Sequence, residues 1–317
     1  MAKDKSGSAC GFRTSIGGQA LIEGILMRGP EKQSIVCRTE DGLVEKVEEL
    51  NFIKDKHPIL GVPFIRGCVT FLDSMIKGVQ ALTYSAELMP EDMQEEPDKF
   101  DLWIAKHFSA EKAQKIVIGI AVILGIALSV GLFIILPTFI TGFFKGIYTN
   151  FFARNLVEGV FRIAILLLYM WLCCKQKDVK RLFSYHGAEH KTIFCYEHGK
   201  ELTVDNVREE SRFHPRCGTS FLLVVIVISI LVNSFFHISN TFARMGVHLL
   251  LLPVVVGIAY EINRWCGRHD NWLSAFLSAP GKWLQRMTTN EPDDGMIECA
   301  IRAMELVIPE QKGKDEW

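Results

Sequence analysis

Four long apolar blocks constrain the fold of this chain more than any other feature of its sequence. They lie between about Ile116 and Ala259, and each contains few or no charged residues. A helix that crosses a hydrocarbon core needs about 20 apolar residues, within a range of about 17–25. Four such blocks in succession favour about four transmembrane helices over the buried helices of a soluble protein. The blocks run over about 116–140, 163–174, 220–236 and 247–259.

The blocks differ in length. We expect the first and the third to cross a membrane unaided, whereas the second and the fourth need their flanking residues. Residues 157–161 extend the second block if Glu158 and Arg162 lie near a membrane surface. Apart from these two residues and Glu261, all at the edges, the spans show almost no buried charge, so a transporter is only a third possibility.

The charged residues between the blocks predict an orientation. With four spans, the N-terminal part, the second connection and the C-terminal part must share one side, and all three are basic. Because basic connections remain in the cytoplasm, we expect a multi-pass protein of the cell membrane with both termini cytoplasmic. The other two connections carry only Lys145 and Arg154, and then Arg244. The basic residues on the shared side are Lys106, Lys112, Lys115, Lys175, Lys177, Lys180, Arg181, Arg264 and Arg268.

The amino-acid composition limits the classes of partner expected for this chain. The 317 residues have a formal net charge of −1, so nothing indicates nucleic acid as a partner. The nine cysteines are an odd number, mostly in segments expected to be cytoplasmic, which argues against a disulfide framework. The first 30 residues contain no long apolar run, so the internal spans are expected to direct insertion. The expected partner is therefore the lipid bilayer, and beside it other membrane proteins.

The remaining residues predict a small β-containing region and amphipathic helices. A turn at Asp41-Gly42 between two alternating stretches is typical of a hairpin, and apolar positions from Arg66 to about Leu88 follow helical spacing. The fold class is therefore a mostly α integral membrane protein with a small N-terminal β-containing cytoplasmic region. The expected divisions are a disordered start (1–14), the hairpin region (15–65), an amphipathic helix and acidic linker (66–115), the transmembrane region (116–262) with a motif connection (175–219), and interfacial and C-terminal helices (263–317).

The C-terminal part suggests two further helices. Tryptophans at Trp272 and Trp283 indicate an interfacial helix. Thr289 and Glu291 are typical of the start of a final amphipathic helix that ends near Ile308.

The most polar connection contains the stretch His186-Gly187-Ala188-Glu189-His190, which has the pattern H-x-x-E-H. On a helix, residues three and four apart share one face, so both imidazoles and the carboxylate point the same way. This arrangement can hold one metal ion and place a base beside it. The alternative is a polar helix at a membrane surface, with its histidines bonded to carboxylates or headgroups.

A metal ion needs further ligands, and two sites can supply them. His214 and Cys217 lie in a Pro- and Gly-containing turn before the third block and can both reach one ion. With the two motif histidines they make a complete tetrahedral set for Zn²⁺ or another divalent transition metal. Glu261 is a second candidate, with Arg264 as its expected ion-pair partner. Glu197 is on the motif face but roughly 10 Å further along the helix axis, too far for a direct ligand.

The chemistry follows from the number of ligands. A closed set of four is a structural site, whereas three protein ligands leave a position for water. In the second case Glu189 would be the general base that takes a proton from metal-bound water. Arg216 or Lys191 would stabilise an oxyanion. The sequence does not decide between the two.

The N-terminal glycine-rich stretch places two charged residues, Glu23 and Arg28, among apolar ones. One interpretation is a tight β-structure in which these two residues form an ion pair. The other is that Glu23 or Arg28 faces the metal site.

Several stretches of the chain together carry a family resemblance. They are Gly17-Gly-Gln-Ala-Leu-Ile-Glu-Gly-Ile-Leu-Met-Arg-Gly, Tyr185-His-Gly-Ala-Glu-His-Lys-Thr, Leu202-Thr-Val-Asp-Asn-Val, His214-Pro-Arg-Cys-Gly-Thr-Ser-Phe and Glu291-Pro-Asp-Asp. From about Ser15 to about Val307 the chain resembles the YqhQ-like bacterial integral membrane proteins. That family has no known function and is often described as a predicted metal-dependent enzyme. The resemblance implies that the motif residues act together, namely His186, Glu189, His190, His214 and Cys217.

The short motif is also similar to that of the inverted-zincin peptidases, which are large soluble enzymes. There the two histidines bind zinc, the glutamate is the base, and a distant glutamate completes the site. This second resemblance implies those roles for His186, Glu189 and His190, with Glu261 in the last position.

The leading hypothesis is a zinc-type metal-dependent hydrolase at the cytoplasmic membrane surface, acting on a peptide or lipid-like substrate. The alternative is a non-enzymatic membrane adaptor in protein insertion, translocation or quality control. The hairpin, the amphipathic helices and the acidic linker offer the surface that such an adaptor needs. A Glu189→Gln variant distinguishes the two, because only the enzyme depends on that carboxylate.

Overall fold

The computed structural model of the chain describes residues 12–50, 57–90, 103–104, 106–144, 150–269 and 271–316. Its elements are mostly helices, with one four-stranded antiparallel sheet. Contacts divide the chain into two compact units. The first unit comprises residues 1–88, 170–225 and 256–317, and the second comprises residues 89–169 and 226–255. Most of the expected acidic linker, from residue 91 on, lies outside the described residues, as do residues 1–11 of the expected disordered start.

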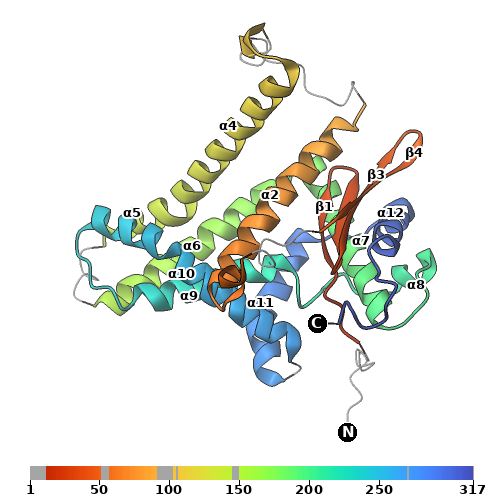
Figure 1. Cartoon of the computed structure of the whole chain (residues 1–317). Coiled ribbons are helices and arrows are strands. Elements are labelled where there is room, and N and C mark those ends of the chain that lie inside the picture. The colour runs from red at the N-terminus through yellow and green to blue at the C-terminus, as the bar shows by residue number, and fades with distance from the viewer. Residues whose placement is uncertain are drawn as a thin grey trace. The chain divides into compact units, whose positions relative to one another are not determined.

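The sheet of the first unit has the order β1-β2-β3-β4, so each strand pairs with its neighbour in sequence (Figure 1). The expected hairpin at Asp41-Gly42 is confirmed, because Thr39 pairs with Gly42 where β3 meets β4. Gly42 has φ 122°, a conformation that glycine adopts without strain. The strands are β1 (Gly17–Leu21), β2 (Gly24–Arg28), β3 (Lys32–Thr39) and β4 (Gly42–Glu49).

Helices cover both faces of the two central strands. Ile25 and Met27 of β2 pack with residues of α7 and α12 in the main core, whereas Leu26 packs with Ala81 of α2 on the other face. A strand buried on both faces loses the alternation of apolar and polar residues. This explains the continuous apolar run in β2. The helices are α2 (Ile65–Glu87), α7 (Lys177–Glu197) and α12 (Asp294–Glu305).

The expected helix from Arg66 is confirmed as α2. The expected start of the last helix at residues 289–291 is wrong, because α12 begins at Asp294. The side chain of Asp293 accepts a hydrogen bond from Met296 N at 2.9 Å and so caps the helix there. The remaining elements of this unit are η1 (Pro58–Gly61), α8 (Val204–Arg208) and α11 (Trp272–Thr288).

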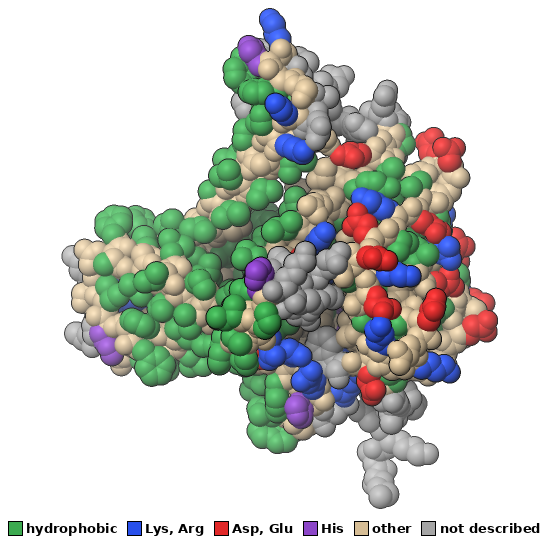
Figure 2. All heavy atoms as spheres, in the orientation of Figure 1, with side chains coloured by type: hydrophobic (Ala, Val, Ile, Leu, Met, Phe, Trp, Pro, Cys, Tyr) green, Lys and Arg blue, Asp and Glu red, His purple; other side chains and the backbone are tan. Residues whose placement is uncertain are grey.

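Three helices within the described residues are long and apolar enough to cross a membrane. The first is continuous over Lys112–Thr141, and the most apolar window of this span is not buried at all. In Figure 2, hydrophobic side chains gather over the apolar helices, whereas acidic ones gather over the strands. The elements are α4 (Ala110–Val130), the π-turn η3 (Gly131–Ile135), α5 (Leu136–Thr141), α6 (Phe151–Cys173) and α10 (Thr241–Arg268).

The expectation of four full-length spans is wrong for the third block. That block forms α9 (Gly218–Asn233), which has only 16 residues. The side chains of Asn233 and Ser234 bond to the carbonyls of Ser229 and Ile230, one turn back, and such bonds compete with helix continuation. The second and fourth blocks, which needed their flanks, lie instead in helices of 23 and 28 residues.

Candidate metal centre

Helix α7 carries the H-x-x-E-H motif on a buried face, as its periodicity indicates. It ends at Glu197 and is followed by Gly199 with φ 66°, a common helix stop. Gly187 lies against the backbone of Asn290, where an added Cβ would come within 2.0 Å of the carbonyl oxygen. The absence of a side chain at this position therefore lets the motif turn pack closely against the segment that follows α11.

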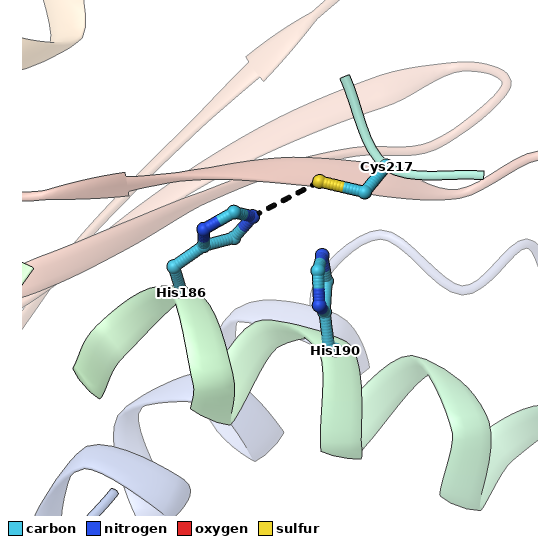
Figure 3. A group of neighbouring side chains, drawn as sticks. All are labelled: His186, His190 and Cys217. Carbon is cyan, nitrogen blue, oxygen red and sulfur yellow. Dashed lines mark hydrogen bonds between the residues drawn. The ribbon is translucent and has the colours of Figure 1, made fainter. Parts of the chain in front are cut away.

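Three side chains of the first unit come together at one point, namely His186, His190 and Cys217. One ligand atom from each lies within 4.8 Å of the others. Figure 3 shows both imidazoles rising from α7 toward the sulfur of Cys217, which lies on the turn just before α9. Within the described parts of the chain this is the group of His, Cys, Asp and Glu side chains with the spacing of a metal site.

Both histidines are oriented by backbone carbonyls. His186 Nδ1 lies 2.8 Å from Thr288 O, and His190 Nδ1 lies 2.6 Å from Arg212 O. Because a carbonyl only accepts, each Nδ1 carries a proton, which leaves each Nε2 as the ring nitrogen that can bind a metal ion in its deprotonated form. His186 Nε2 is 3.2 Å from Cys217 Sγ, and His190 Nε2 is buried with no hydrogen-bond partner among the described residues. Metal-ligating histidines typically have this arrangement.

Cys217 sits in an environment that favours its thiolate. Burial disfavours the charged forms of both Cys217 and His186, but their mutual attraction outweighs it. The two motif histidines hold the pKa of Cys217 well below its ordinary value of 9.0, and Cys217 raises the pKa of His186 to about 9. Thr219 N at the start of α9 also donates to Cys217 Sγ at 3.4 Å. A thiolate is the form of cysteine that binds metal.

Glu189 lies beside this group, on the same turn of α7. Its Oε1 accepts a hydrogen bond from Gly18 N at 3.0 Å, whereas its Oε2 is buried with no partner in the described part of the chain. Burial raises the pKa of this carboxyl above its ordinary value, and the two histidines offset the effect only in part. Glu189 is thus a carboxyl that is held by the backbone on one oxygen and has the other available.

His214 and Arg216 have other partners. His214 Nε2 lies 3.5 Å from Glu197 Oε2, and Arg216 forms an ion pair with the other oxygen of Glu197. Burial lowers the pKa of His214 to about 4, although Glu197 opposes the shift. The His214 ring packs 5.6 Å from that of His190. The structure therefore places His214 in contact with a ligand candidate and outside the group of three.

Glu261, the other candidate ligand, is engaged by Arg66 of α2. Both guanidinium edges contact the carboxylate, with Arg66 Nε 2.7 Å from Glu261 Oε1. The partner expected from the sequence was Arg264, one helical turn away. A bidentate guanidinium contact is the stronger geometry, and only the tertiary fold brings α2 to this position.

The expected ion pair between Glu23 and Arg28 does not form. Glu23, at φ 49° in the β1–β2 turn, pairs with Arg181 and accepts from Tyr185. Arg28 pairs with Asp73 of α2 at 2.7 Å. Arg28 nevertheless lines the same cavity as the two motif histidines. The glycine-rich stretch also contacts Glu189 through Gly18 N, a contact for which the sequence contains no signal beyond the glycines themselves.

A cavity of about 860 Å³ opens onto the cluster. Both motif histidines, Glu189 and Cys217 line it, together with residues 17–20 of β1 and residues of α2. The cluster is thus accessible from a space large enough for a small molecule or a segment of peptide.

The fold and the site define a mostly helical protein with three potential spans, a small sheet and a His/His/Cys cluster at a cavity. The chain belongs to the family described as "Protein of unknown function (DUF1385)", whose model matches residues 62–310. It is 31% identical over 302 residues to a protein of Bacillus subtilis (strain 168) named "Uncharacterized protein YqhQ", and the match covers 92% of each chain. This confirms the family expected from the motifs. No solved structure matches the chain significantly.

Gly187→Ala tests the close packing of the motif turn. The new methyl group would meet the Asn290 carbonyl oxygen, so the backbone must shift and we expect a loss of about 1–3 kcal/mol in the free energy of unfolding. Gly125→Ala is the matched control, because an added Cβ there meets nothing within 4 Å and alanine favours a helix. Thermal unfolding of both purified variants measures the difference, and equal midpoints would contradict the packing.

Proposed function

We propose that this protein is a metal-dependent hydrolase of the zinc type, with His186, His190 and Cys217 as the protein ligands. The observation that carries the proposal is the convergence of one nitrogen from each imidazole and one cysteine sulfur within 4.8 Å. Ligand atoms of a tetrahedral zinc site lie about 3.3–3.8 Å apart, given bond lengths of about 2.0–2.3 Å. The present separations are within about 1 Å of that geometry.

A three-ligand site favours catalysis over a purely structural role, because it leaves a coordination position for water. The side chain that would have closed the site, His214, faces Glu197 instead. Glu189 Oε2 is the buried acceptor beside the ligands, and in this proposal it takes the proton from the attacking water. A carboxyl held by Gly18 N on its other oxygen is positioned for that transfer.

The sequence offered two residues for stabilising an oxyanion, Lys191 and Arg216, and in the structure both have other partners. Lys191 donates to the carbonyls of Arg208 and Glu210 and so braces the loop after α8. Arg216 lines the cavity and has Glu197 as its ion-pair partner. Of the two, Arg216 remains the proposed group for stabilising negative charge on a substrate.

The strand beside the cluster favours a peptide over a lipid-like substrate. β1 is an outer strand of the sheet, and its residues 17–20 line the cavity. Gly17 and Gly18 have no side chains, and Gly18 is exposed. An outer strand offers backbone groups to an extended segment, as in recognition by strand addition. A peptide along β1 would pass beside Glu189, which contacts Gly18.

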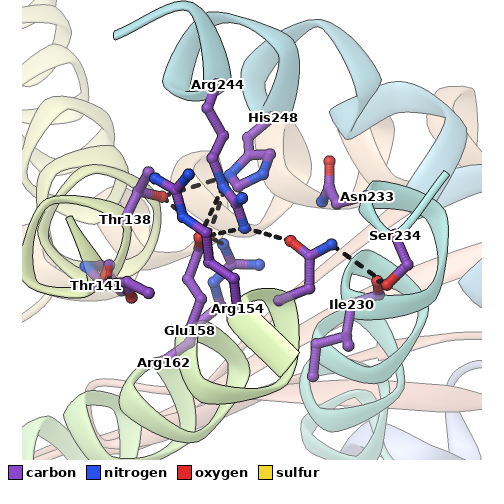
Figure 4. A network of polar contacts seen from close by, with 12 residues as sticks. Thr138, Thr141, Arg154, Glu158, Arg162, Ile230, Asn233, Ser234, Arg244 and His248 are labelled. Carbon is purple, nitrogen blue, oxygen red and sulfur yellow. Dashed lines mark hydrogen bonds and ion pairs between the residues drawn. The ribbon is translucent and has the colours of Figure 1, made fainter. Parts of the chain in front are cut away.

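We further propose a multi-pass location in the cell membrane with both termini cytoplasmic. The three long apolar helices support it, and α9 would complete an even number as a short crossing of about 24 Å. The sequence predicts Arg154 and Arg244 in the two connections on the outer side of the membrane. In the structure they lie in the network of polar contacts that Figure 4 shows and are only 1% and 3% exposed, so they add no exposed positive charge to those connections. On α11, Trp272 and Phe276 are exposed, which suits a helix at a membrane interface.

Metal content is the first test. We expect about one zinc ion per chain in the detergent-purified protein, and its loss in the double variant His186→Ala/His190→Ala, because both Nε2 ligands are removed. The exposed His269 supplies the matched control, since His269→Ala should keep the metal. Elemental analysis and zinc titration provide the readout.

Unmutated protein without any transition metal would end the metal proposal. If, in addition, Cys217 were alkylated rapidly and His186→Ala slowed that reaction, the thiol–imidazole pair at 3.2 Å would be identified as a nucleophile instead.

Glu189→Gln tests the base. Glutamine cannot accept the proton from water, so we expect the variant to bind zinc but to lose about 10²–10⁴-fold in kcat/KM on a library of fluorogenic peptides. Retained metal with lost turnover separates a base from a ligand. A variant with full turnover, or one that keeps its whole cellular role, would favour the membrane adaptor over the enzyme.

Topology depends on whether α9 crosses the membrane. Alkaline phosphatase inserted after the exposed Asn240, between α9 and α10, should be active because it reaches the outer side. The same insertion after the exposed Lys200 should be inactive. Activity at Lys200, or inactivity at Asn240, would contradict the orientation.

A further inference from the structure

Strand β4 forms one edge of the sheet, and its outer side is unpaired. Figure 1 shows it at the opposite edge from β1. Leu50 N, directly after β4, donates to the carbonyl of Glu31, which precedes β3. Because the backbone groups of successive residues point alternately to the two sides of a strand, the even-numbered residues of β4 face β3. The N–H and C=O groups of residues 43, 45, 47 and 49 therefore point outward, and among the described residues they have no hydrogen-bond partner.

This edge lacks the backbone features that usually protect an outer strand, which are a proline, a bulge or a very short length. β4 has eight residues and no proline. It pairs with β3 at eight consecutive positions without a bulge. An unpaired strand of this length is a template for an added strand. The protection that remains is charge, and charge selects which strand can pair.

The side chains along this edge alternate between apolar and acidic. Side chains two residues apart in a strand share one face, and Glu45 identifies this face as that of α12, because it pairs with Arg302 of that helix. Leu43 is 37% exposed and Val47 is 45% exposed. An added strand would place its own side chains about 4.5–5.5 Å from these. The exposed residues of this face are Leu43, Glu45, Val47 and Glu49.

The charge around the edge has one sign. Residues 40–49 contain five acidic residues and one basic residue, a net charge of −4, and Figure 2 shows the acidic side chains over the strands. Two of the five pair with Arg302 and Lys46. Three have no cationic partner within the described parts of the chain, namely Glu40, Asp41 and Glu49.

This charge distinguishes between the possible occupants of the edge. A second copy of the chain would bring the same net charge of −4 to the pair of strands, and like charges on paired strands are destabilising. A segment with lysine or arginine would instead place cations beside Glu45 and Glu49, and its apolar residues would contact Leu43 and Val47. Complementary charge also excludes the wrong partners.

We propose that β4 is a docking edge for an extended, basic segment of another protein, which pairs with it as a fifth, antiparallel strand. In the orientation proposed above the sheet is cytoplasmic, where the segments that flank membrane spans are rich in lysine and arginine. Segments of the required composition are therefore present beside it. The docking edge contains no residue of the candidate metal centre, so each proposal can fail without the other.

The first test uses the full chain, purified in a neutral detergent, and the fluorescein-labelled peptide Lys-Thr-Val-Thr-Lys-Thr-Val with both ends capped. Antiparallel to β4, its lysines lie opposite the two glutamates and its valines opposite the two apolar residues. Fluorescence anisotropy measures the affinity. We expect binding that weakens with salt, and binding that is about tenfold weaker or less when glutamate replaces both lysines. No binding, or equal binding of the two peptides, overturns the proposal.

Methylation of the peptide backbone separates strand pairing from simple charge attraction. In the proposed register the N–H groups of the lysines and valines face β4, whereas those of the threonines face away. We expect N-methyl groups on one valine and one lysine to weaken binding about tenfold or more, because two hydrogen bonds are lost. N-methyl groups on two threonines are the matched control and should leave the affinity unchanged. Equal effects of the two methylated peptides overturn the proposal.

Val47→Pro tests the same contact from the side of the protein. Because the N–H of Val47 points outward, proline is tolerated there without loss of a β3–β4 bond, but its ring blocks an added strand. We expect weaker peptide binding than in Val47→Thr, the matched control, which keeps both the N–H and the branched side chain. Equal binding in two folded variants overturns the proposal.

Light scattering tests the other occupant of the edge. A dimer of the unmutated chain that Val47→Pro separates into monomers would assign the edge to a second copy and overturn the proposal. The methylated peptides need no variant, so they decide the question if the proline variant does not fold.

Discussion

Two hydrogen bonds to backbone carbonyls determine what the rest of the site can do. His186 and His190 each donate Nδ1–H to a carbonyl, that of Thr288 at the end of α11 and that of Arg212 after α8. Without these acceptors a buried imidazole N–H would be unpaired, at a cost of about 1–3 kcal/mol each. With them, both rings are fixed and both Nε2 atoms face Cys217. Two segments far apart in sequence must therefore be in place before the three ligand candidates can converge.

The local part of this arrangement could be predicted from the sequence. The spacing of His186, Glu189 and His190 predicts one helical face, and α7 has it. The turn at Pro215 also follows from short-range signals, whereas Cys217 lies 31 residues from His186 and was a ligand candidate by its residue type. The length of the apolar helices follows less well, since the polar residues Asn233 and Ser234 end α9 through contacts with its own backbone. A hydropathy pattern does not account for the competition between these side-chain hydrogen bonds and continuation of the helix.

Contacts between distant segments could not be predicted. Arg264 was the natural partner of Glu261 by helical spacing, but Arg66 lies 195 residues away and makes the bidentate contact. The same holds for His214, whose partner Glu197 belongs to the motif helix. In each case the carboxylate pairs with the cation that has the best geometry, and tertiary packing alone decides which cation that is. The sequence therefore predicts which residues are candidate ligands more reliably than it distinguishes the direct ligands from the residues that contact them.

Strand β1 and the candidate metal centre both require glycine at position 18. A Cβ at Gly18 would lie 2.5 Å from the carbonyl oxygen of Leu26 and 3.1 Å from the carboxyl carbon of Glu189. Any other residue would therefore disturb β1 and displace the proposed base together. Glycine weakens a strand, because it loses more conformational freedom on folding and has no side chain to pack. In the outer strand β1 this lower stability is compatible with the proposed function. The N–H of Gly18 bonds Glu189 Oε1, and Glu189 Oε2 remains available as an acceptor.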